Sequence, residues 1–561
     1  MPSSYERGGM TWHVTLDYET YEQAFEAFEW DLPADYNAAE DLLRKHDDCD
    51  EPALHQAYPD GRRETYTFRE LDERSDQFAS ALVDRGVDRG DRVAVVVPQK
   101  PANPLTHLAS WKLGAISLPL SILFGPDALR FRLQDSGARA VVVDGTVLET
   151  VRDVRDDCPD LEHVIAVDAE DPGENVEQFR AVREDYDAGV DIAETEAETP
   201  AIVMYTSGST GPPKGVLHGH GVWVGHCPAF NMYFERDVFD SMFWTPADWA
   251  WIGALGDVLY PAWHYGQPVV GYPMGSFDEA TTFELLEEYD VTDTFLPPTA
   301  IRMMMDVKDP AERYDLSLET ICSGGEPLTP EILEWAEDSL AGVAVNELYG
   351  QTEANLLVTN CREWFTARAG SMGKPVAGHE VAVVDRETGE RLPPDEVGMI
   401  AVRRNDDDPV VFQEYWNQPE KTDAATLPAA DGGADWHLTD DLGYVDEAGY
   451  FWFKSRDDDV IITAGYRVGP GEVESAILEH PDVQQAGVVG TPDDTRGEII
   501  KAFVLPTESV EGDDALRGEI RELVRDQLAK YEYPREIEFV DEFPTTTTGK
   551  IQRRKLRRGE T

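Results

Sequence analysis

The chain has 561 residues, of which 41% are hydrophobic and 10% aromatic. It is too long for a single hydrophobic core, so we expect two or more globular domains, and this composition excludes a chain that is disordered throughout. The charge is extreme, with 110 acidic against 48 basic residues and a formal net charge of −62. Because nucleic-acid backbones bind basic patches, this balance argues against a nucleic-acid partner.

The acidic residues are spread along the whole chain and are not gathered in one tail. Short runs such as Asp406 to Asp408 and Asp457 to Asp459 interrupt otherwise globular sequence. Such a surface repels itself in dilute salt and is screened at about 1 M salt, where the Debye length is about 3 Å. We therefore predict a halophilic, cytoplasmic protein that works in a salt-rich cytoplasm.

The five cysteines are scattered and form no CxxC pair, which argues against a disulfide framework or a cysteine zinc site. The first 18 residues contain no apolar signal core, and no apolar run approaches 18 residues. We therefore expect neither a signal peptide nor a membrane span.

Residues up to about Asp50 are mixed and aromatic, and we expect them to form an arm that lies on a larger body. From there, continuous apolar strands alternate with helical patterns, which predicts parallel sheets covered by helices on both faces. We predict strands at 91–98, 140–143, 164–167, 201–204, 291–296, 320–322 and 343–348, and helices at 70–85, 101–113, 283–289 and 331–340.

The pattern becomes antiparallel after Glu380, with strands at 380–384 and 399–403, and indicates a smaller β-rich subdomain. The acidic run at 457–459 is typical of a hinge, and a compact α+β pattern follows it. We therefore predict an α/β fold: a large N-terminal domain (1–457) of parallel α/β subdomains plus the β-rich subdomain, and a small mobile α+β C-terminal domain (458–561). The boundary is expected near Asp458.

One stretch, Tyr205 to Gly215, reads Tyr-Thr-Ser-Gly-Ser-Thr-Gly-Pro-Pro-Lys-Gly and follows the strand predicted at 201–204. Its glycines allow close approach of the backbone to a ligand, and its hydroxyls and one ammonium suit phosphate groups. It is not a Walker A loop, because Lys214 lies between Pro213 and Gly215 and no Gly-Lys-Ser/Thr is present. A flexible Gly/Ser surface loop is the alternative. The residues expected to bind phosphate are Thr206, Ser207, Gly208, Ser209, Thr210, Gly211 and Lys214.

This stretch resembles the signature loop of the adenylate-forming superfamily, which includes acyl-CoA synthetases, adenylation domains of peptide synthetases and luciferases. A second motif, Tyr349 to Glu353, lies where the superfamily has its counterpart, and the resemblance extends over Asn37 to Arg557. The segments 245–253 and 465–474 look most like medium-chain and short-chain acyl-CoA synthetases. The resemblance implies the fold predicted above.

The resemblance also implies a nucleotide site. Thr352 would contact phosphate and take part in catalysis, and Glu353 would hold Mg²⁺, a cation that prefers oxygen ligands. Asp441 would accept hydrogen bonds from both ribose hydroxyls, with Arg456 as the second ribose contact. The chain departs from the superfamily at Asp440, where glycine is usual. The other residues implied for the nucleotide are Gly325, Glu326 and Pro327 of the adenine-binding turn, and Glu347, Tyr349, Gly350 and Gln351.

In the C-terminal domain the resemblance implies a hinge at Asp458 and a catalytic lysine, Lys550, after Thr-Gly. Lys550 would bridge a carboxylate and an anionic phosphate that must meet. A basic tail is otherwise a solvated chain end or a nucleic-acid patch. The residues implied for coenzyme A are Gly465, Tyr466, Arg467 and Tyr533.

Three histidines, His218, His220 and His226, lie beside Cys227 and are compatible with zinc. No acidic ligand accompanies them, however, and the superfamily has a histidine-bearing helix after its phosphate loop, so we do not expect a metal there.

We therefore predict an enzyme that ligates a carboxylic acid (medium-chain fatty, branched or aryl) to coenzyme A through an acyl-adenylate, with ATP, Mg²⁺ and coenzyme A as cofactors and release of AMP and pyrophosphate. Superfamily members dedicated to acetate have tryptophan where this chain has Gly350, which implies acids longer than acetate. Three alternatives stay open: a free-standing enzyme that loads a carrier protein, an acetate or short-chain enzyme, and a nucleotide-binding regulator without catalysis. The sequence leaves the acid and the oligomeric state open.

Overall fold

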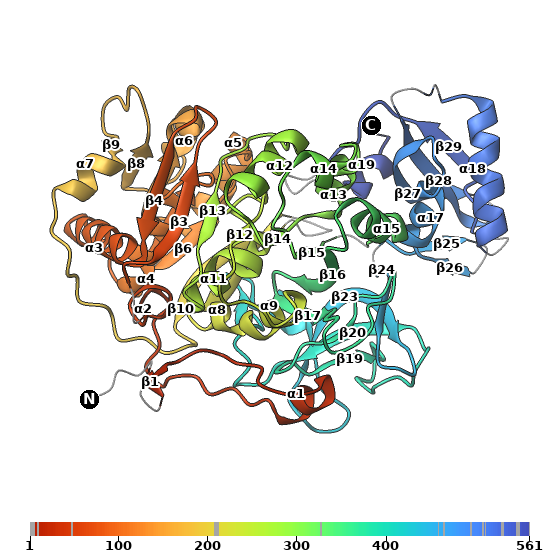
Figure 1. Cartoon of the computed structure of the whole chain (residues 1–561), viewed down its shortest axis with the longest axis horizontal. Helices are drawn as coiled ribbons and strands as arrows, with labels where there is room; N and C mark the ends of the chain where they lie inside the picture. Colours follow the sequence, from red (N-terminus) through yellow and green to blue (C-terminus); the bar gives the residue numbers. More distant parts are fainter. Residues whose placement is uncertain are drawn as a thin grey trace. The chain divides into compact units, whose positions relative to one another are not determined.

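The computed structural model describes residues 6–7, 10–46, 49–206, 212–325, 328–457, 459–463, 466–493, 496–507, 510, 512–528, 532–545 and 550–559. The chain divides into two compact units. Figure 1 labels their helices and strands. Unit 1 comprises Met1–Val381, Val402–Leu427 and Ala434–His437, and unit 2 comprises Ala382–Ala401, Pro428–Gly433 and Leu438–Thr561.

Unit 1 contains an eight-stranded sheet in which six neighbouring strands run parallel and two more add antiparallel at one end. One of these two antiparallel strands follows the predicted phosphate loop, and the other comes from a segment much later in the chain. In sheet order the strands are β21 (Glu414–Tyr415), β11 (Lys214–Gly219), β10 (Pro200–Thr206), β6 (Ile116–Pro119), β5 (Arg92–Val96), β7 (Ala140–Asp144), β8 (His163–Val167) and β9 (Glu177–Gln178).

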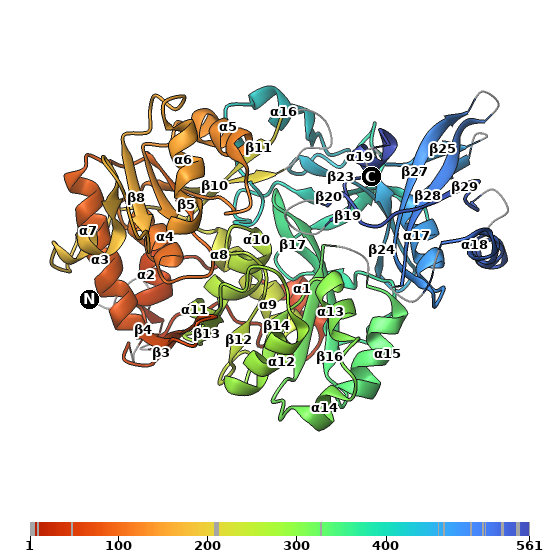
Figure 2. The same cartoon turned by 90° about the horizontal axis from the view of Figure 1, so that it is seen from above.

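Successive residues of the central strands β5 and β7 enter two different cores, which is why these strands are almost entirely apolar. In β5, Val93 and Val95 pack with the helices α3 (Phe68–Asp84) and α4 (Ala102–Lys112). Ala94 and Val96 point the opposite way and pack with α5 (Pro126–Ser136) and α6 (Leu148–Arg155) (Figure 2). The helices therefore cover both faces of the sheet, as the sequence pattern predicts. The short helices α7 (Phe179–Glu184) and α16 (Pro419–Ala424) also belong to unit 1.

A second sheet of unit 1 has nine strands, with a parallel centre and antiparallel strands at both ends. In sheet order they are β18 (Lys374–Pro375), β17 (Ala354–Thr359), β16 (Ala344–Gln351), β15 (Thr320–Gly324), β14 (Asp293–Phe295), β12 (Phe243–Trp244), β13 (Val269–Gly271), β3 (Pro52–Ala57) and β4 (Arg63–Thr67). The β3–β4 hairpin was not among the predicted strands.

Helices on one face of this second sheet pack with Ile321 and Val345, and those on the other face with Phe295 and Cys322. The first group is α12 (Glu279–Glu288), α13 (Pro298–Met304) and α15 (Pro330–Ser339). The second group is α9 (Cys227–Tyr233) and α11 (Tyr260–His264), and the remaining helices are α8 (Val222–Gly225), α10 (Ile252–Ala254), the π-helix Leu255–Leu259 and α14 (Pro310–Arg313).

The N-terminal segment lies on unit 1 as an arm, as expected. Trp12, Val14 and Leu16 are buried in the main core. The Tyr21 hydroxyl donates a hydrogen bond to the Pro375 carbonyl (2.9 Å) and so ties the arm to β18. The arm carries β1 (Glu6–Arg7), β2 (Met10–Thr11), α1 (Tyr21–Ala27) and α2 (Ala38–Leu43).

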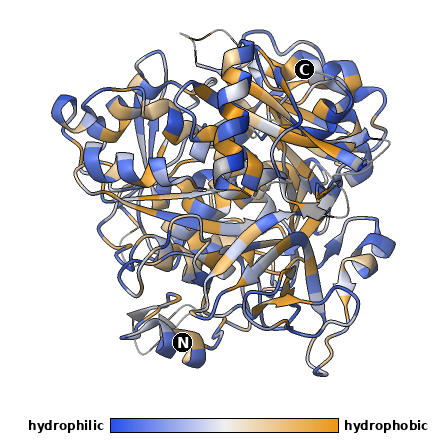
Figure 3. Cartoon of the chain, turned by 90° about the vertical axis from the view of Figure 1, so that its right-hand side faces the viewer, coloured by the Kyte–Doolittle hydropathy of each residue, from blue (hydrophilic) through white to orange (hydrophobic). Residues whose placement is uncertain are grey.

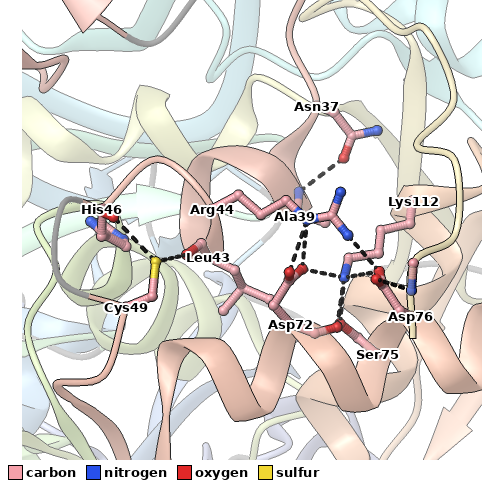
Figure 4. Close-up of polar contacts among 11 residues, drawn as sticks. Asn37, Ala39, Leu43, Arg44, His46, Cys49, Asp72, Ser75, Asp76 and Lys112 are labelled. Atoms are coloured by element: carbon pink, nitrogen blue, oxygen red, sulfur yellow. Dashed lines mark hydrogen bonds and ion pairs between the residues drawn. The ribbon is translucent and has the colours of Figure 1, made fainter. Parts of the chain in front are cut away.

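A buried ion cluster joins α2, α3 and α4 (Figure 4). The ammonium of Lys112 is fully buried and lies 2.5 Å from Asp72 and 2.6 Å from Asp76. Arg44 contacts both carboxylates from the other side, at 2.8 and 2.7 Å. Burial lowers the pKa of Lys112, and the two aspartates oppose that effect. The cluster places two positive and two negative charges in mutual contact, which suits a buried position.

A five-stranded sheet contains β19 (Val381–Val384), β20 (Gly398–Arg403), β23 (Trp436–Val445), β22 (Thr426–Leu427) and β24 (Phe451–Arg456). The β-rich region predicted after Glu380 is therefore present. In unit 2, β24 pairs antiparallel with β23. A further five-stranded sheet of unit 2 contains β25 (Ile461–Thr463), β26 (Tyr466–Val468), β27 (Val483–Asp493), β28 (Gly497–Pro506) and β29 (Glu536–Phe539).

Three helices accompany this last sheet: α17 (Pro470–Leu478), α18 (Asp514–Gln527) and α19 (Arg553–Arg557). Along α18, Leu516, Ile520 and Val524 recur every fourth residue and enter the core of the unit. Figure 3 shows that the helices on the right-hand side of Figure 1 carry both hydrophilic and hydrophobic residues.

The α/β fold class is confirmed by these sheets. The domain boundary near Asp458 and the mobility of the C-terminal domain stay predictions, and Asp458 itself lies outside the described residues. In the described part of the chain, no helix has the length and apolar character that crossing a membrane requires.

Candidate active site

The glycine-rich stretch connects two antiparallel strands. Thr206 at the end of β10 lies opposite Lys214 at the start of β11. Both ends of the predicted phosphate loop are therefore held by the sheet. The five residues Ser207, Gly208, Ser209, Thr210 and Gly211 lie outside the described residues.

Lys214 belongs to a three-residue cluster with Tyr415 and Glu353. Its ammonium lies 3.1 Å from the Tyr415 hydroxyl and 4.0 Å from Oε1 of Glu353. The same hydroxyl donates a hydrogen bond to Oε1 of Glu353 at 2.8 Å, and the ammonium lies 4.2 Å from the centre of the tyrosine ring. Two motifs that are far apart in the sequence, the phosphate loop and the Tyr349–Glu353 motif, thus meet at one place.

The second motif forms the turn of a β-hairpin. Gln351 at the end of β16 pairs with Ala354 at the start of β17, so Thr352 and Glu353 occupy the tip. His218 of β11 donates from Nε2 to the Thr352 carbonyl (2.7 Å), and the amide of Phe412 donates to the Glu353 carbonyl (2.8 Å). The tip is therefore fixed by backbone contacts as well as by its side chains.

The residues around Glu353 fit a magnesium ion that is shared with phosphate groups. Mg²⁺ commonly uses one or two carboxylates and completes its shell with phosphate and water oxygens. Glu353 presents a carboxylate next to the lysine at the end of the phosphate loop. The described residues contain no group of three His, Cys, Asp or Glu side chains placed to hold a metal, so a fully protein-built cage is not found among them.

Gly350 lies where the backbone of β16 approaches a buried polar group. A Cβ atom at this position would lie 2.9 Å from Oδ1 of Asn355 and 3.1 Å from the Ala354 carbonyl oxygen. Nδ2 of Asn355 donates to Oδ1 of Asp257 (2.7 Å) and lies 3.0 Å from Nε2 of His226. Burial raises the pKa of Asp257 well above its ordinary value. Any side chain at Gly350 must therefore shift Asn355, because the Cβ atom itself makes the close contact.

The predicted adenine-binding turn follows β15. A Cβ atom on Gly324 would lie 2.3 Å from Cδ1 of Leu348, and Gly325 has φ +90°, so both positions require glycine. Glu347 pairs in register with Ser323 on the neighbouring strand. Burial raises the pKa of Glu347 to about 8, although an amide hydrogen bond opposes the effect. Glu326 and Pro327 lie outside the described residues.

The two predicted ribose contacts lie opposite each other in unit 2. Asp441 of β23 and Arg456 of β24 are register partners, and Nε of Arg456 lies 3.2 Å from Oδ1 of Asp441. Asp440 has φ +59°, a left-handed conformation that glycine adopts readily and aspartate tolerates. The aspartate that replaces the usual glycine therefore keeps a glycine-like turn.

Lys550 and Tyr533 are two further predicted site residues of unit 2. Lys550 is exposed and precedes Ile551, whose bridge with Thr545 is antiparallel. Tyr533 lies between Arg525 and Arg535, whose guanidinium carbons are 4.0 and 5.1 Å from its ring centre. Hydrogen bonding to Arg525, opposed by burial, lowers the pKa of Tyr533.

The coenzyme A segment is described only in part. Gly465 lies outside the described residues, and Tyr466 and Arg467 are assigned to β26 without a description of their side chains.

Two features of the site were not predicted. Tyr415 joins the phosphate loop to Glu353 but lies in a two-residue strand, and no motif around it signals this role. His218 lies on β11, so the expected histidine-bearing helix directly after the loop is wrong for this residue. The extended pairing of β11 with β10 explains the difference. His220 and His226 are both buried, with separate partners: His220 accepts from the amide of Ala38 and His226 contacts Val222.

A glycine-rich segment between two strands, a lysine and a carboxylate that meet beside it, and the predicted ribose contacts Asp441 and Arg456 are the features expected of an AMP-binding, adenylate-forming enzyme. The chain matches the family model AMP-binding enzyme over residues 44–416 and the model AMP-binding enzyme C-terminal domain over residues 472–550. It therefore belongs to the AMP-binding enzyme family, and the resemblance predicted from the sequence is confirmed.

Individual relatives are similar over almost their whole length. The chain is 36% identical to the acetyl-coenzyme A synthetase of Bacillus subtilis (strain 168), over 97% of this chain and 95% of that protein. It is 33% identical to the mitochondrial acyl-coenzyme A synthetase ACSM3 of Rattus norvegicus, over 98% and 94%. Among solved structures, the anthranilate CoA ligase AuaEII in complex with anthranoyl-AMP matches with a TM-score of 0.83 and 29% identity, over 94% of this chain and 98% of that chain.

Proposed function

We propose that this chain joins a carboxylic acid to coenzyme A in two steps and converts ATP to AMP and pyrophosphate. The observation that carries the proposal is the contact among Lys214, Tyr415 and Glu353, because it brings the end of the phosphate loop to the carboxylate suited to Mg²⁺. The relatives named as coenzyme A synthetases over nearly the full chain support it.

In the first step the carboxylate attacks the α-phosphorus of ATP, an acyl–phosphate bond forms, and the bond to pyrophosphate breaks. Both reacting groups are anions, so nearby cations lower the barrier. Lys214 and Lys550 are the two lysines that the proposal assigns to this charge. Mg²⁺ at Glu353 would neutralise further phosphate charge.

Two further groups of residues are suited to the nucleotide. The facing pair Asp441 and Arg456 suits ribose hydroxyls, with the carboxylate as acceptor and the guanidinium as donor. Gly325 lets the backbone approach the adenine, and the buried carboxyl of Glu347 stays protonated at neutral pH, which favours a neutral ligand group beside it.

In the second step the thiol of coenzyme A attacks the acyl carbon, a thioester forms, and AMP leaves. The segment Gly465–Arg467 and Tyr533 receive coenzyme A. The C-terminal domain, 458–561, rotates about Asp458 between the two steps, so that Lys550 serves the first step and the Gly465 segment serves the second.

The acid is longer than acetate: a medium-chain fatty, branched or aryl acid. Gly350 supports this, because it contributes no side chain to the site and stands where acetate-dedicated members of the superfamily have tryptophan. An acetate-specific enzyme is the second candidate, since the chain is 36% identical to an acetyl-coenzyme A synthetase. The strongly acidic surface supports a cytoplasmic enzyme that works in molar KCl.

The test is a screen of acids with the purified chain in 2 M KCl and Mg²⁺. ATP–pyrophosphate exchange is measured with acetate, butyrate, hexanoate and benzoate, and coenzyme A thioester is then measured with the best acid. We expect exchange and thioester formation, with acetate as a poor substrate. Exchange without thioester would favour an enzyme that loads a carrier protein, and absence of exchange with every acid would favour a regulator without catalysis.

A further inference from the structure

We propose that Arg553 is a positioning residue that holds the Lys550 segment in one orientation relative to Asp459, the residue after the predicted hinge. This inference rests on the proposed function, in which Lys550 acts in the adenylation step. All residues that carry it belong to unit 2.

Arg553 forms a fork of contacts to two acidic residues. Its Nε and Nη2 lie 3.0 and 2.6 Å from the two carboxylate oxygens of Glu474, a bidentate arrangement. Its Nη1 lies 3.1 Å from Oδ2 of Asp459. Burial alone would lower the pKa of Arg553, but the two carboxylates outweigh burial and raise it. The guanidinium therefore stays charged and links α17 to Asp459, the residue after the predicted hinge.

Glu474 is a fixed anchor. Its Oε1 also accepts a hydrogen bond from the amide of Val488 at 2.7 Å, so α17 and β27 hold it in place. Only 13% of its side chain is exposed, against 26% for Arg553. An ion pair of this kind, fully paired and mostly buried, contributes more to orientation than to the free energy of unfolding. Arg553 therefore has a defined direction in the unit.

Asp459 is held from two sides. Oδ2 contacts Arg553, and Oδ1 lies 2.8 Å from Nη2 of Arg557, one helical turn further along α19. The amide of Asp459 also donates to the Arg456 carbonyl at 3.1 Å. The start of the chain after the hinge is thus connected to α19 through two arginines.

Lys550 lies three residues before Arg553, and the chain between them is anchored. Ile551 bridges Thr545, and the amide of Gln552 donates to the Pro544 carbonyl at 2.7 Å. Ile551 packs on the core that contains Leu556. The backbone after Lys550 is therefore fixed by the core, and the fork of Arg553 fixes the direction of α19 beyond it.

The consequence concerns catalysis through Lys550. If the fork is broken, Lys550 keeps its charge but loses its fixed placement relative to the hinge. A misplacement of about 1 Å can reduce a rate about 100-fold. The thioester step does not use Lys550, so it should be spared.

The test compares Arg553→Met with Arg554→Met in 2 M KCl. Arg554 is exposed on the same helix, so its variant removes the same charge without breaking the fork. We expect Arg553→Met to lower kcat for ATP–pyrophosphate exchange 10- to 100-fold, with KM for ATP within about twofold and thioester formation from synthetic acyl-adenylate unchanged. Arg554→Met should match the wild type. Arg553→Lys, which keeps one charged contact, should recover part of the rate.

A double variant distinguishes a positioning role from a structural one. If Arg553 acts through Lys550, the combined Lys550→Ala and Arg553→Met variant loses no more exchange activity than Lys550→Ala alone. An additive loss, an equal loss of both half-reactions, or a wild-type rate in Arg553→Met would each overturn the proposal. Lack of exchange by the wild type would instead count against the proposed function.

A measurement that needs no activity completes the test. Hydrogen exchange should become faster in Arg553→Met at the amides of residues 459–463 and 550–553 together, and should stay unchanged in Arg554→Met. Unchanged protection of both segments in Arg553→Met would also overturn the proposal.

Discussion

The ammonium of Lys214 and the carboxylate of Glu353 lie 4.0 Å apart, with the hydroxyl of Tyr415 in contact with both. The charge that ends the phosphate loop and the charge suited to Mg²⁺ therefore hold each other in place before any ligand arrives. A magnesium–phosphate group would fit this arrangement, with Glu353 to hold the metal and Lys214 to meet the phosphate.

Replacement of Glu353 by glutamine should impair adenylation. The change keeps the shape but removes the charge, so we expect exchange activity to fall about 100-fold and the Mg²⁺ concentration for half-maximal rate to rise. Tyr415→Phe is the comparison: it keeps the ring over Lys214 and removes the hydroxyl that contacts both Glu353 and Lys214, so metal affinity should fall only about 10-fold. A Mg²⁺ titration of both variants measures this. An unchanged magnesium requirement in Glu353→Gln would contradict the assignment.

Lys550→Ala should abolish adenylation and spare thioester formation. The expected loss in exchange is about 10²- to 10³-fold, as for removal of one group that stabilises transition-state charge. Synthetic acyl-adenylate plus coenzyme A should still give product at the wild-type rate, because the lysine has no role in that step. Near-normal ATP-dependent turnover would show that the lysine has another role.

Gly350→Trp should shorten the range of accepted acids. Activity on hexanoate and benzoate should fall far more than activity on acetate, because the indole would exclude methylenes that contribute about 0.8 kcal/mol each when buried. Gly350→Ala is the control, since its Cβ would lie 2.9 Å from Oδ1 of Asn355 and requires only a small shift. The measurement is kcat/KM for the four acids in all three proteins. If alanine removes activity on every acid equally, glycine serves only the close approach to Asn355.

Glu347→Gln should change how stability depends on pH. The pKa of Glu347 is raised from 4.5 to about 8, so the folded protein keeps a proton that the unfolded chain releases above pH 4.5. The stability that the protonated Glu347 carboxyl contributes is fully present below about pH 4.5, falls as pH rises, and is lost above pH 8. At about 1.36 kcal/mol per unit, the upper bound is about 5 kcal/mol. In urea unfolding at pH 5, 6.5 and 8, the free energy of unfolding of the variant should rise relative to that of the wild type as pH rises. The same difference at all three pH values would contradict the raised pKa of Glu347.

Lys112→Met should be strongly destabilising, by about 3–5 kcal/mol, because it leaves Asp72 and Asp76 with Arg44 as their shared partner in Figure 4. The loss should be nearly the same at 1 and 3 M KCl, since salt screens a buried cluster weakly. Arg62→Met is the control, because its exposed pair with Asp60 should contribute little to stability. Denaturant unfolding of both variants decides, and equal losses would argue against a special role for the buried cluster.

The sequence predicts the parts of the fold that depend on local pattern. Strand β5 is apolar from Val93 to Val96 because both of its faces are buried, and this pattern alone indicates a covered parallel sheet. The glycine-rich stretch and the Tyr349–Glu353 motif are also local, so their residues could be selected before the structure was known. The Thr-Gly-Lys motif at Lys550 belongs to the same group.

Other features depend on contacts between distant segments and leave no local signal. Tyr415 is one of two residues in β21, and its role follows from the pairing of that strand with β11. The polar environment of Gly350 comes from Asp257 and His226, more than ninety residues away in the chain, through Asn355. Likewise, the β3–β4 hairpin has a mixed composition, and its place in the second sheet is set by the pairing with β13.

The pairing of Thr206 with Lys214 has a consequence for chain entropy. Directly opposed residues of antiparallel strands lie about 4.5–5.5 Å apart, so the sheet itself closes the glycine-rich segment. The entropy lost on closing a loop grows only with the logarithm of its length, about 0.6 kcal/mol per doubling, and here that loss belongs to folding. A ligand that contacts this segment therefore does not have to supply the entropy of closing it. Segments of different length and composition can be carried by the same hairpin at little expense in stability, which leaves phosphate recognition free to diverge while the sheet stays the same.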